Sequence, residues 1–273
     1  KAAVNRLGSH PYFLKEASRL AQKGHVLFSL GKISIDKNDN PQIAWLREAY
    51  KREDDFSEKA TIQQSLRKML REQLRWEEAI SVATEYADSL DAFSTYLRDR
   101  KTEAQTFVWE LKARMQDTSG VALLANALLH HPQNEALRLS YADALAHSGQ
   151  YQAALPVLKE GLSLLQATGG QSVTFIKNIA LFSALSGDTA QATKLLNRFK
   201  HRADARTTHL LILLEKYPEA LTLWKELPIA STLEKAQKAW LKVALFEAKG
   251  ERAAAKKARK EWDALGVAEA WVL

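Results

Sequence analysis

The first polar stretch that could bind a metal is the loop around Asn38. Asp36, Asn38 and Asn40 occupy alternate positions there, as in the opening of a calcium-binding loop. Such a loop also needs a glycine at its sixth position and a glutamate at its twelfth, where this chain has Pro41 and Arg47. Because both required residues are missing, the sequence predicts a polar turn and not a calcium site.

Two further groups contain residues that elsewhere bind zinc or transfer protons. His130 and His131 are adjacent, so on a helix they point to different faces, whereas two histidines bind one zinc ion from positions i and i+4. Glu77 and Glu78 follow Trp76 at an expected helix start, where acidic side chains complement the helix dipole. Both groups are typical of helix ends, and we predict no metal site.

Nucleophilic and cofactor-binding motifs are also missing. The Gly-x-Ser-x-Gly elbow, the P-loop and the dinucleotide fingerprint do not occur, and the chain has no cysteine. We therefore expect no catalytic residue and no cofactor, and we predict that the protein is not an enzyme. The lack of cysteine slightly favours the periplasm or cell envelope over the cytoplasm and leaves the compartment open.

Composition and charge point to a helical protein without a membrane segment. In 273 residues there are only six prolines and eleven glycines, while helix-forming residues dominate. Lys32–Asp36 is the one short alternating stretch that favours a strand. No apolar run reaches the roughly 18 residues of a membrane span. The net charge of +7 is spread along the chain, so we do not expect nucleic acid as the partner.

A recurring pattern organises the sequence. Five times, a polar or glycine-containing break is followed by an aromatic or small residue and then by alanine, between two amphipathic helical patterns. These segments are Arg75–Ala79, Gly149–Ala154, Gly187–Ala192, Lys216–Ala220 and Gly250–Ala255. Such a helix, tight turn and helix repeated along a chain predicts an all-α solenoid of antiparallel helix pairs.

The clearest unit, 135–168, resembles a tetratricopeptide repeat. Its large, small and turn positions are occupied in the order of that family by Tyr141, Ala142, Leu145, Gly149, Tyr151, Ala154, Leu158 and Gly161. The preceding unit has Gly120 at the small position of its second helix and Pro132 at its close, and the following unit has Ala180, Gly187 and Ala192. The resemblance implies a right-handed α-α superhelix.

The predicted boundaries follow from these matches. We expect an irregular helical region with degenerate repeats at 1–100. Repeats should then follow at about 101–134, 135–170, 171–202, 203–230 and 231–264, with a C-terminal cap at 265–273 that carries Trp271. The chain begins at Lys1 without methionine, so we expect a processed chain or an excised domain.

The resemblance implies a protein-interaction scaffold whose first helices line a concave groove for a peptide or helix of a partner. The groove positions would be Leu139, Asp143, His147, Lys177, Asn178, Leu181, Trp240 and Glu247. Trp240 is the residue for which packing within the core and binding of a partner are both open. A role in bacterial cell-envelope assembly or secretion fits the absence of cysteine.

Other classes of function stay open at this point. The alternatives are a helical nucleic-acid-binding or regulatory module, and a non-catalytic domain of a larger enzyme or outer-membrane protein. The sequence does not identify the partner or the oligomeric state.

Overall fold

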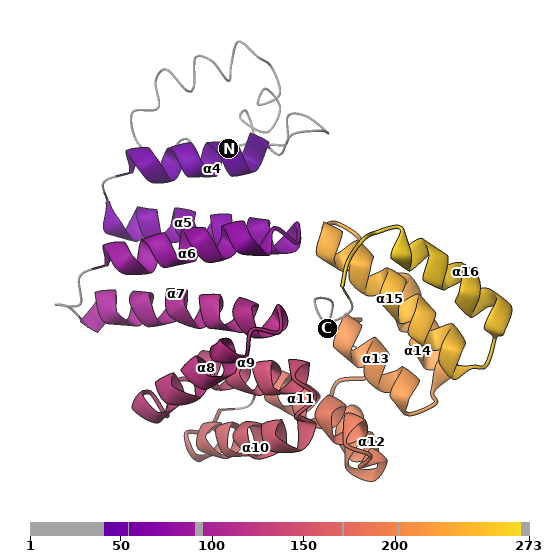
Figure 1. Cartoon of the computed structure of the whole chain (residues 1–273). Coiled ribbons are helices and arrows are strands. Elements are labelled where there is room, and N and C mark those ends of the chain that lie inside the picture. The colour runs from indigo at the N-terminus through magenta and orange to yellow at the C-terminus, as the bar shows by residue number, and fades with distance from the viewer. Residues whose placement is uncertain (1–40, 54, 91–94, 171, 201–202, 269–273) are drawn as a thin grey trace. The chain divides into compact units, whose positions relative to one another are not determined.

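The computed structural model describes residues 41–53, 55–90, 95–170, 172–200 and 203–268. These residues form thirteen α-helices and no strand (Figure 1). The helices are α4 (Pro41–Arg52), α5 (Phe56–Glu72), α6 (Trp76–Ser89), α7 (Thr95–Arg114), α8 (Thr118–His130), α9 (Glu135–His147), α10 (Tyr151–Ala167), α11 (Val173–Leu185), α12 (Thr189–Leu196), α13 (Ala205–Leu213), α14 (Tyr217–Glu226), α15 (Thr232–Ala248) and α16 (Arg252–Asp263). The all-α class predicted from the sequence is confirmed. None of these helices has the length and apolar content needed to cross a membrane.

Several sequence predictions lie outside the described residues. They are the short strand at 32–36, the polar turn before Pro41 and Trp271 in the C-terminal cap. Of the predicted cap, the structure describes only 265–268, which follow α16 without forming a helix.

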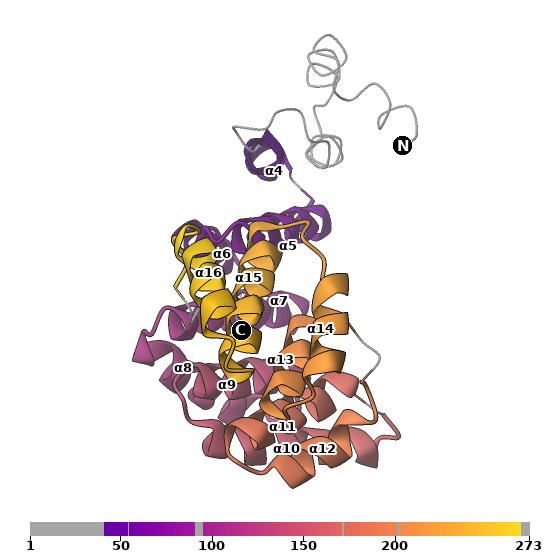
Figure 2. The same cartoon turned by 90° about the vertical axis from the view of Figure 1, so that its right-hand side faces the viewer.

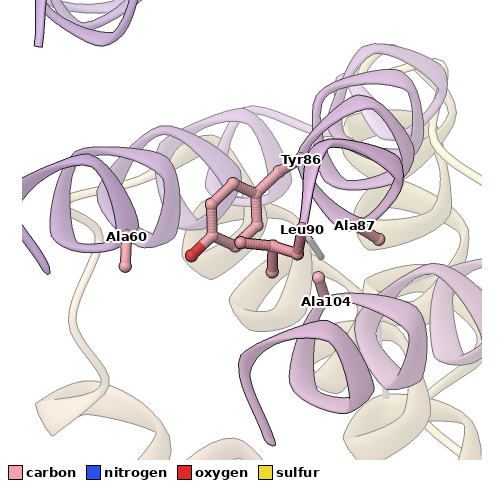
Figure 3. Packing of buried hydrophobic residues seen from close by; sticks show 5 residues of the cluster. All are labelled: Ala60, Tyr86, Ala87, Leu90 and Ala104. Carbon is pink, nitrogen blue, oxygen red and sulfur yellow. The ribbon is translucent and has the colours of Figure 1, made fainter. Parts of the chain in front are cut away.

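The chain divides into two compact units, residues 1–105 and 106–273. In the first unit α4 packs on α5 and α5 on α6, and the last two lie side by side along their length (Figure 1). Tyr86 of α6 is buried among Ala60 of α5, Leu90 at the end of α6 and Ala104 of α7. Its ring lies between Ala60 and Leu90 (Figure 3). The ring of Tyr50 meets Tyr86 edge-on with centroids 6.4 Å apart, a favourable aromatic geometry.

Ion pairs support the helices of the first unit. Arg67 is buried on α5, and its Nη2 donates to Glu103 Oε1 of α7 at 3.1 Å. Glu78 accepts hydrogen bonds from Arg75 and Arg47, and these bonds, the one from Arg75 first, lower the pKa of its carboxyl. Glu78 therefore links the start of α6 to α4.

In the second unit the helices from α9 onward pack as consecutive pairs. The pairs are α9 with α10, α11 with α12, α13 with α14 and α15 with α16. Successive pairs are joined because α10 packs on α11, α11 on α13 and α13 on α15. Figure 2 shows α15 and α16 lying side by side, as they also do in Figure 1.

Close helix contacts occur where the sequence places small residues. A Cβ atom on Gly161 of α10 would lie 2.4 Å from both Arg138 Cδ of α9 and Phe175 Cε1 of α11. A Cβ atom on Gly120 of α8 would lie 2.4 Å from the carbonyl oxygen of Trp109 in α7. Real Cβ atoms do not approach so closely, so glycine is the residue that lets these helices pack.

One type of turn joins the two helices of every pair. After Ala146 in α9, Gly149 adopts a left-handed φ of +73°, its N–H donates to the carbonyl oxygen of Ala146 at 2.9 Å, and the N–H of Gln150 donates to that of Leu145 at 2.9 Å. This is the Schellman arrangement that ends a helix. The residues with left-handed φ at the corresponding turns are Leu74, Gln116, Gly149, Gly187, Glu215 and Gly250.

Three of those positions are therefore occupied by residues other than glycine. Leu74, Gln116 and Glu215 have φ of 61°, 63° and 58°. A side chain in this region costs roughly 1–2 kcal/mol relative to ordinary helical geometry. The turns are alike in the backbone and differ in sequence, which explains why the glycine pattern breaks at these places.

Candidate functional site

The first helices of four successive pairs, α9, α11, α13 and α15, supply most of the wall of a pocket in the second unit. Its volume is about 190 Å³. The lining residues are Asp143, Ala146, His147, Tyr151, Leu181, Phe182, Leu185, Arg206, His209 and Trp240. We call this the A-helix pocket. It has a polar end and an apolar wall, and each is built from several helices.

Arg206 holds the polar end together. It lies in the first turn of α13, and its Nη2 donates to Asp143 Oδ2 of α9 at 2.6 Å. Its Nη1 donates to Asn178 Oδ1 of α11, also at 2.6 Å. One guanidinium thus connects three consecutive helix pairs, using the planar fork that distinguishes arginine from lysine.

The start of α13 is fixed by its own cap. The carboxylate of Asp204 accepts from the backbone N–H of Thr207 at 2.9 Å and from Lys177 Nζ of α11 at 2.9 Å. A capping aspartate satisfies a free N–H group of the first helical turn. These bonds set the position of α13 and with it the direction of Arg206.

The ion pair decides the charge of Asp143. Burial by itself would raise the pKa of this carboxyl, but the charge and hydrogen bond of Arg206, followed by Arg114 and His147, hold it below the ordinary value. Burial would lower the pKa of Arg206, and the charge and hydrogen bond of Asp143 raise it instead. The two residues form a charged and mutually neutralised pair, with 14% and 20% of their side chains exposed.

Two neutral imidazoles also line the A-helix pocket. Burial, with the positive charges of Arg114 and Arg206, lowers the pKa of His147 to about 3 against the opposite effect of Asp143. Burial alone lowers the pKa of His209 to about 4. Both rings are therefore uncharged near neutral pH.

The apolar wall is aromatic in large part. The ring of Trp240 meets His209 edge-on with centroids 4.9 Å apart. Tyr151 and Phe182 lie with centroids 6.2 Å apart, and Leu181 is almost fully buried. These groups give the pocket flat apolar surfaces next to its polar end.

Some polar atoms of this region have no hydrogen-bond partner within the described part of the chain. They are Asp143 Oδ1, His147 Nε2, Asn178 Nδ2 and His209 Nδ1. Leaving a buried polar atom unpaired costs about 1–3 kcal/mol, so an ordered water or ion is the ordinary partner of such atoms. Three of these residues, Asp143, His147 and His209, line the A-helix pocket.

The structure brings four of the eight predicted groove residues together in this pocket: Asp143, His147, Leu181 and Trp240. Trp240 is packed in the core, with 9% of its surface exposed, and it also lines the pocket. Core packing and partner binding, the two roles left open by the sequence, are both compatible with this position. Whether any of these residues contacts a partner stays a prediction.

The other four predicted residues lie elsewhere. Asn178 is 1% exposed and binds Arg206, so it supports the pocket without lining it. Lys177 is paired with Asp204, and exposed Glu247 accepts from Arg259 Nη2 of α16 at 2.7 Å. Leu139 is half-buried on α9 and is not among the lining residues.

Sequence reasoning missed six lining residues: Ala146, Tyr151, Phe182, Leu185, Arg206 and His209. Leu185 follows Leu181 by one helical turn, so extending the same row of α11 would have found it. Arg206 and His209 lie on α13, in the predicted repeat 203–230, for which no groove residue was predicted. The signal that could have found Arg206 is a charged residue in the first turn of a helix whose last residues, Leu210–Leu213, are apolar.

Among the described residues, no group of three or more histidine, aspartate or glutamate side chains could hold a metal ion. His130 and His131, which the sequence placed at a helix end, are exposed at the end of α8. The A-helix pocket combines charged and polar side chains with aromatic ones, which is the make-up of a binding site.

Comparison with solved structures identifies the fold. A tetratricopeptide repeat protein from Parabacteroides merdae ATCC 43184 superimposes with a TM-score of 0.56 and 14% sequence identity, covering 91% of this chain and 95% of that one. The fold is that of a tetratricopeptide repeat protein. The resemblance stated from the sequence is thereby confirmed at the level of the fold. No protein-family model and no curated protein matches the sequence.

Proposed function

We propose that this tetratricopeptide-repeat-like protein is a non-catalytic scaffold that receives a peptide or helix of a partner protein on its A helices. The observation that carries the proposal is the A-helix pocket, because residues from successive repeats converge there. A partner segment lying across these helices would contact several repeats at once.

The chemistry of the pocket supports a mixed polar and apolar contact. Trp240, Phe182 and Leu181 supply the kind of apolar surface on which interface anchors rest, and aromatic residues are frequent in such anchors. The Arg206–Asp143 pair carries no net charge, so the pocket does not select a strongly charged segment. The cell-envelope setting stays a prediction that depends on the absence of cysteine.

Basic side chains of α15 and α16 bear on the nucleic-acid alternative. Lys242 is paired with Glu261, and Arg259 with Glu247. Of the cluster at Lys256–Lys260, Arg259 is the residue that belongs to one of these two pairs. Its pairing makes it less available to a phosphate backbone, which binds cationic side chains.

A matched pair of variants tests the proposal. Leu185→Glu places a charge in the pocket. Leu195→Glu places a charge at a half-buried position of α12, outside the pocket. Proteins captured from a lysate of the source by wild type should be lost with Leu185→Glu and retained with Leu195→Glu, both variants being folded by circular dichroism. Equal recovery with the two variants would show that partners bind elsewhere.

A further inference from the structure

One face of α16 carries a row of exposed cations. The helix packs on α15, which lies beside it (Figure 1), and its buried residues are Ala255, Ala258 and Trp262. On a different face, Arg252, Lys256 and Lys260 are all exposed. Residues four apart share one side of a helix and are spaced about 6 Å along its axis. We call these three residues the cation row.

The cation row has no counter-charge of its own. In the described part of the chain, none of its three side chains forms an ion pair or a hydrogen bond. Acidic residues near the row are paired with other cations: Glu247 with Arg259, Glu251 with Lys249 and Glu261 with Lys242. The hydrogen bond from Lys242 lowers the pKa of Glu261, and the charge of Lys257 adds to this effect. Lys257 is therefore not counted in the row.

The spacing of the row restricts the shape of a matching ligand. Such a ligand must present negative groups about 6 Å apart along a line. Carboxylates on every fourth residue of a helix have this spacing, because all α-helices rise by about 1.5 Å per residue. An acidic helix lying along α16 would therefore place one carboxylate opposite each of the three cations.

A wide anionic surface matches the row less well. A membrane or a nucleic-acid duplex would also cover the neighbouring ion pairs, which are already neutral. The side chains of Glu247, Glu251 and Glu261 are 50%, 43% and 45% exposed, so their carboxylates would face the phosphates. Proteins that bind duplexes tightly make about 6–10 phosphate contacts, and a row of three cations supplies far fewer.

We propose that the cation row of α16 binds an acidic helix of a protein partner, with glutamate or aspartate on every fourth residue. None of the three residues lines the A-helix pocket, so this is a second binding surface. The inference goes beyond the function proposed for that pocket and does not depend on it. Exposed ion pairs are individually weak, so the contact has low affinity and salt weakens it.

The test uses the full chain and two labelled alanine-rich peptides of about 20 residues, which is long enough to form a helix. Both peptides carry three glutamates, on every fourth residue in the first and on every fifth in the second. Glutamates five residues apart point to different sides of a helix, while composition and charge stay equal. In fluorescence anisotropy at low salt, the first peptide should bind about fivefold more tightly, and added salt should reduce its affinity.

Two triple variants show whether the row is the site. The row variant combines Arg252→Gln, Lys256→Gln and Lys260→Gln. The control removes the same charge at exposed lysines of other helices, by Lys159→Gln, Lys194→Gln and Lys225→Gln. The row variant should lose about tenfold or more in affinity for the first peptide, and the control should bind like wild type. If the row variant does not fold by circular dichroism, Lys256→Glu reverses the central charge and should weaken binding by about threefold.

Equal binding of the two peptides, equal losses in the two triple variants, or no binding of either peptide at low salt would overturn the proposal. Tighter binding of duplex DNA or of phosphatidylserine vesicles than of the first peptide, abolished in the row variant, would also overturn it, because the ligand would then be a phosphate surface. The Leu185→Glu capture experiment changes α11 and no residue of the row. The scaffold proposal is therefore tested separately.

Discussion

Acid should destabilise this protein through two buried histidines, His147 and His209. Their pKa values are lowered to about 3 and about 4 in the folded chain, whereas an unfolded histidine has a pKa near 6.5. As the pH falls, the unfolded chain therefore takes up protons before the folded chain does. The stabilisation is complete above about pH 6.5 and is lost progressively toward the folded pKa values.

The lowered pKa of each histidine has its own causes in the groups around the imidazole ring. His147 faces Asp143, Arg114 and Arg206, of which the two arginines add to the effect of burial and Asp143 opposes it. His209 lies against Trp240, and burial is the cause of its shift. Protonating either ring in the folded chain would place a charge beside groups that cannot balance it.

At pH 5 the size of the effect does not depend on the exact folded pKa values, because both lie below 5. The unfolded pKa is about 1.5 units above that pH, which corresponds to roughly 2 kcal/mol for each histidine and about 4 kcal/mol for the two. Domains are stable by only about 5–15 kcal/mol, so the loss would be large.

The assay is urea unfolding at pH 7.5 and pH 5, followed by circular dichroism. Wild type should lose about 4 kcal/mol more between these pH values than the double variant His147→Gln with His209→Gln, whose side chains do not titrate. His130→Gln with His131→Gln, at two exposed positions, should behave as wild type. If the double variant shows the same pH dependence as wild type, water reaches both rings and the burial argument is wrong.

Three further predictions concern the turns, the helix contacts and the ion pair. Glu215→Gly should raise the free energy of unfolding by about 1 kcal/mol in urea titrations, because Glu215 has a left-handed φ of 58°, and Gly149→Ala should lower it by a similar amount. Gly120→Ala should lower the free energy of unfolding by about 1–3 kcal/mol despite the better helix propensity of alanine, since its Cβ would meet backbone atoms of α7. The control is Ser163→Ala at an exposed position of α10. An equal effect of the two substitutions would refute the close contact. Arg206→Met should lower the free energy of unfolding by about 3–5 kcal/mol, because Asp143 would remain as a buried charge. Arg206→Met combined with Asp143→Leu should lower it clearly less. Equal losses in the single and double variants would show that the two residues are not coupled.

The helices and their pairing were predictable because each helix–turn–helix repeat has the same local sequence pattern. Gly149, Gly187 and Gly250 mark turns that the sequence displays directly. The turns at Leu74, Gln116 and Glu215 have the same backbone geometry, but packing of the flanking helices holds those residues in a conformation that their side chains disfavour. A pattern based on glycine therefore fails at these turns, although the fold does not change there.

The candidate site was predictable only where one helix supplies a row of residues. Asp143 and His147 are one helical turn apart on α9, so the spacing alone assigns them to one face. The partner of Asp143 is Arg206, which is 63 residues away in sequence. No local pattern connects them, because their contact depends on how three repeats are stacked.

That dependence makes the pocket a property of the stacked array. A fragment ending before α13 would keep all the predicted groove residues of α9 and α11, which are Leu139, Asp143, His147, Lys177, Asn178 and Leu181. It would lose Arg206, so the carboxylate of Asp143 would lose the cation paired with it and the amide oxygen of Asn178 would lose its donor. Because burial raises the pKa of a carboxyl group that has lost its ion pair, the polar end of the pocket would lose its charged arrangement. Binding by this surface should therefore require the repeats through α15, even for a ligand whose contacts lie mainly on α9 and α11.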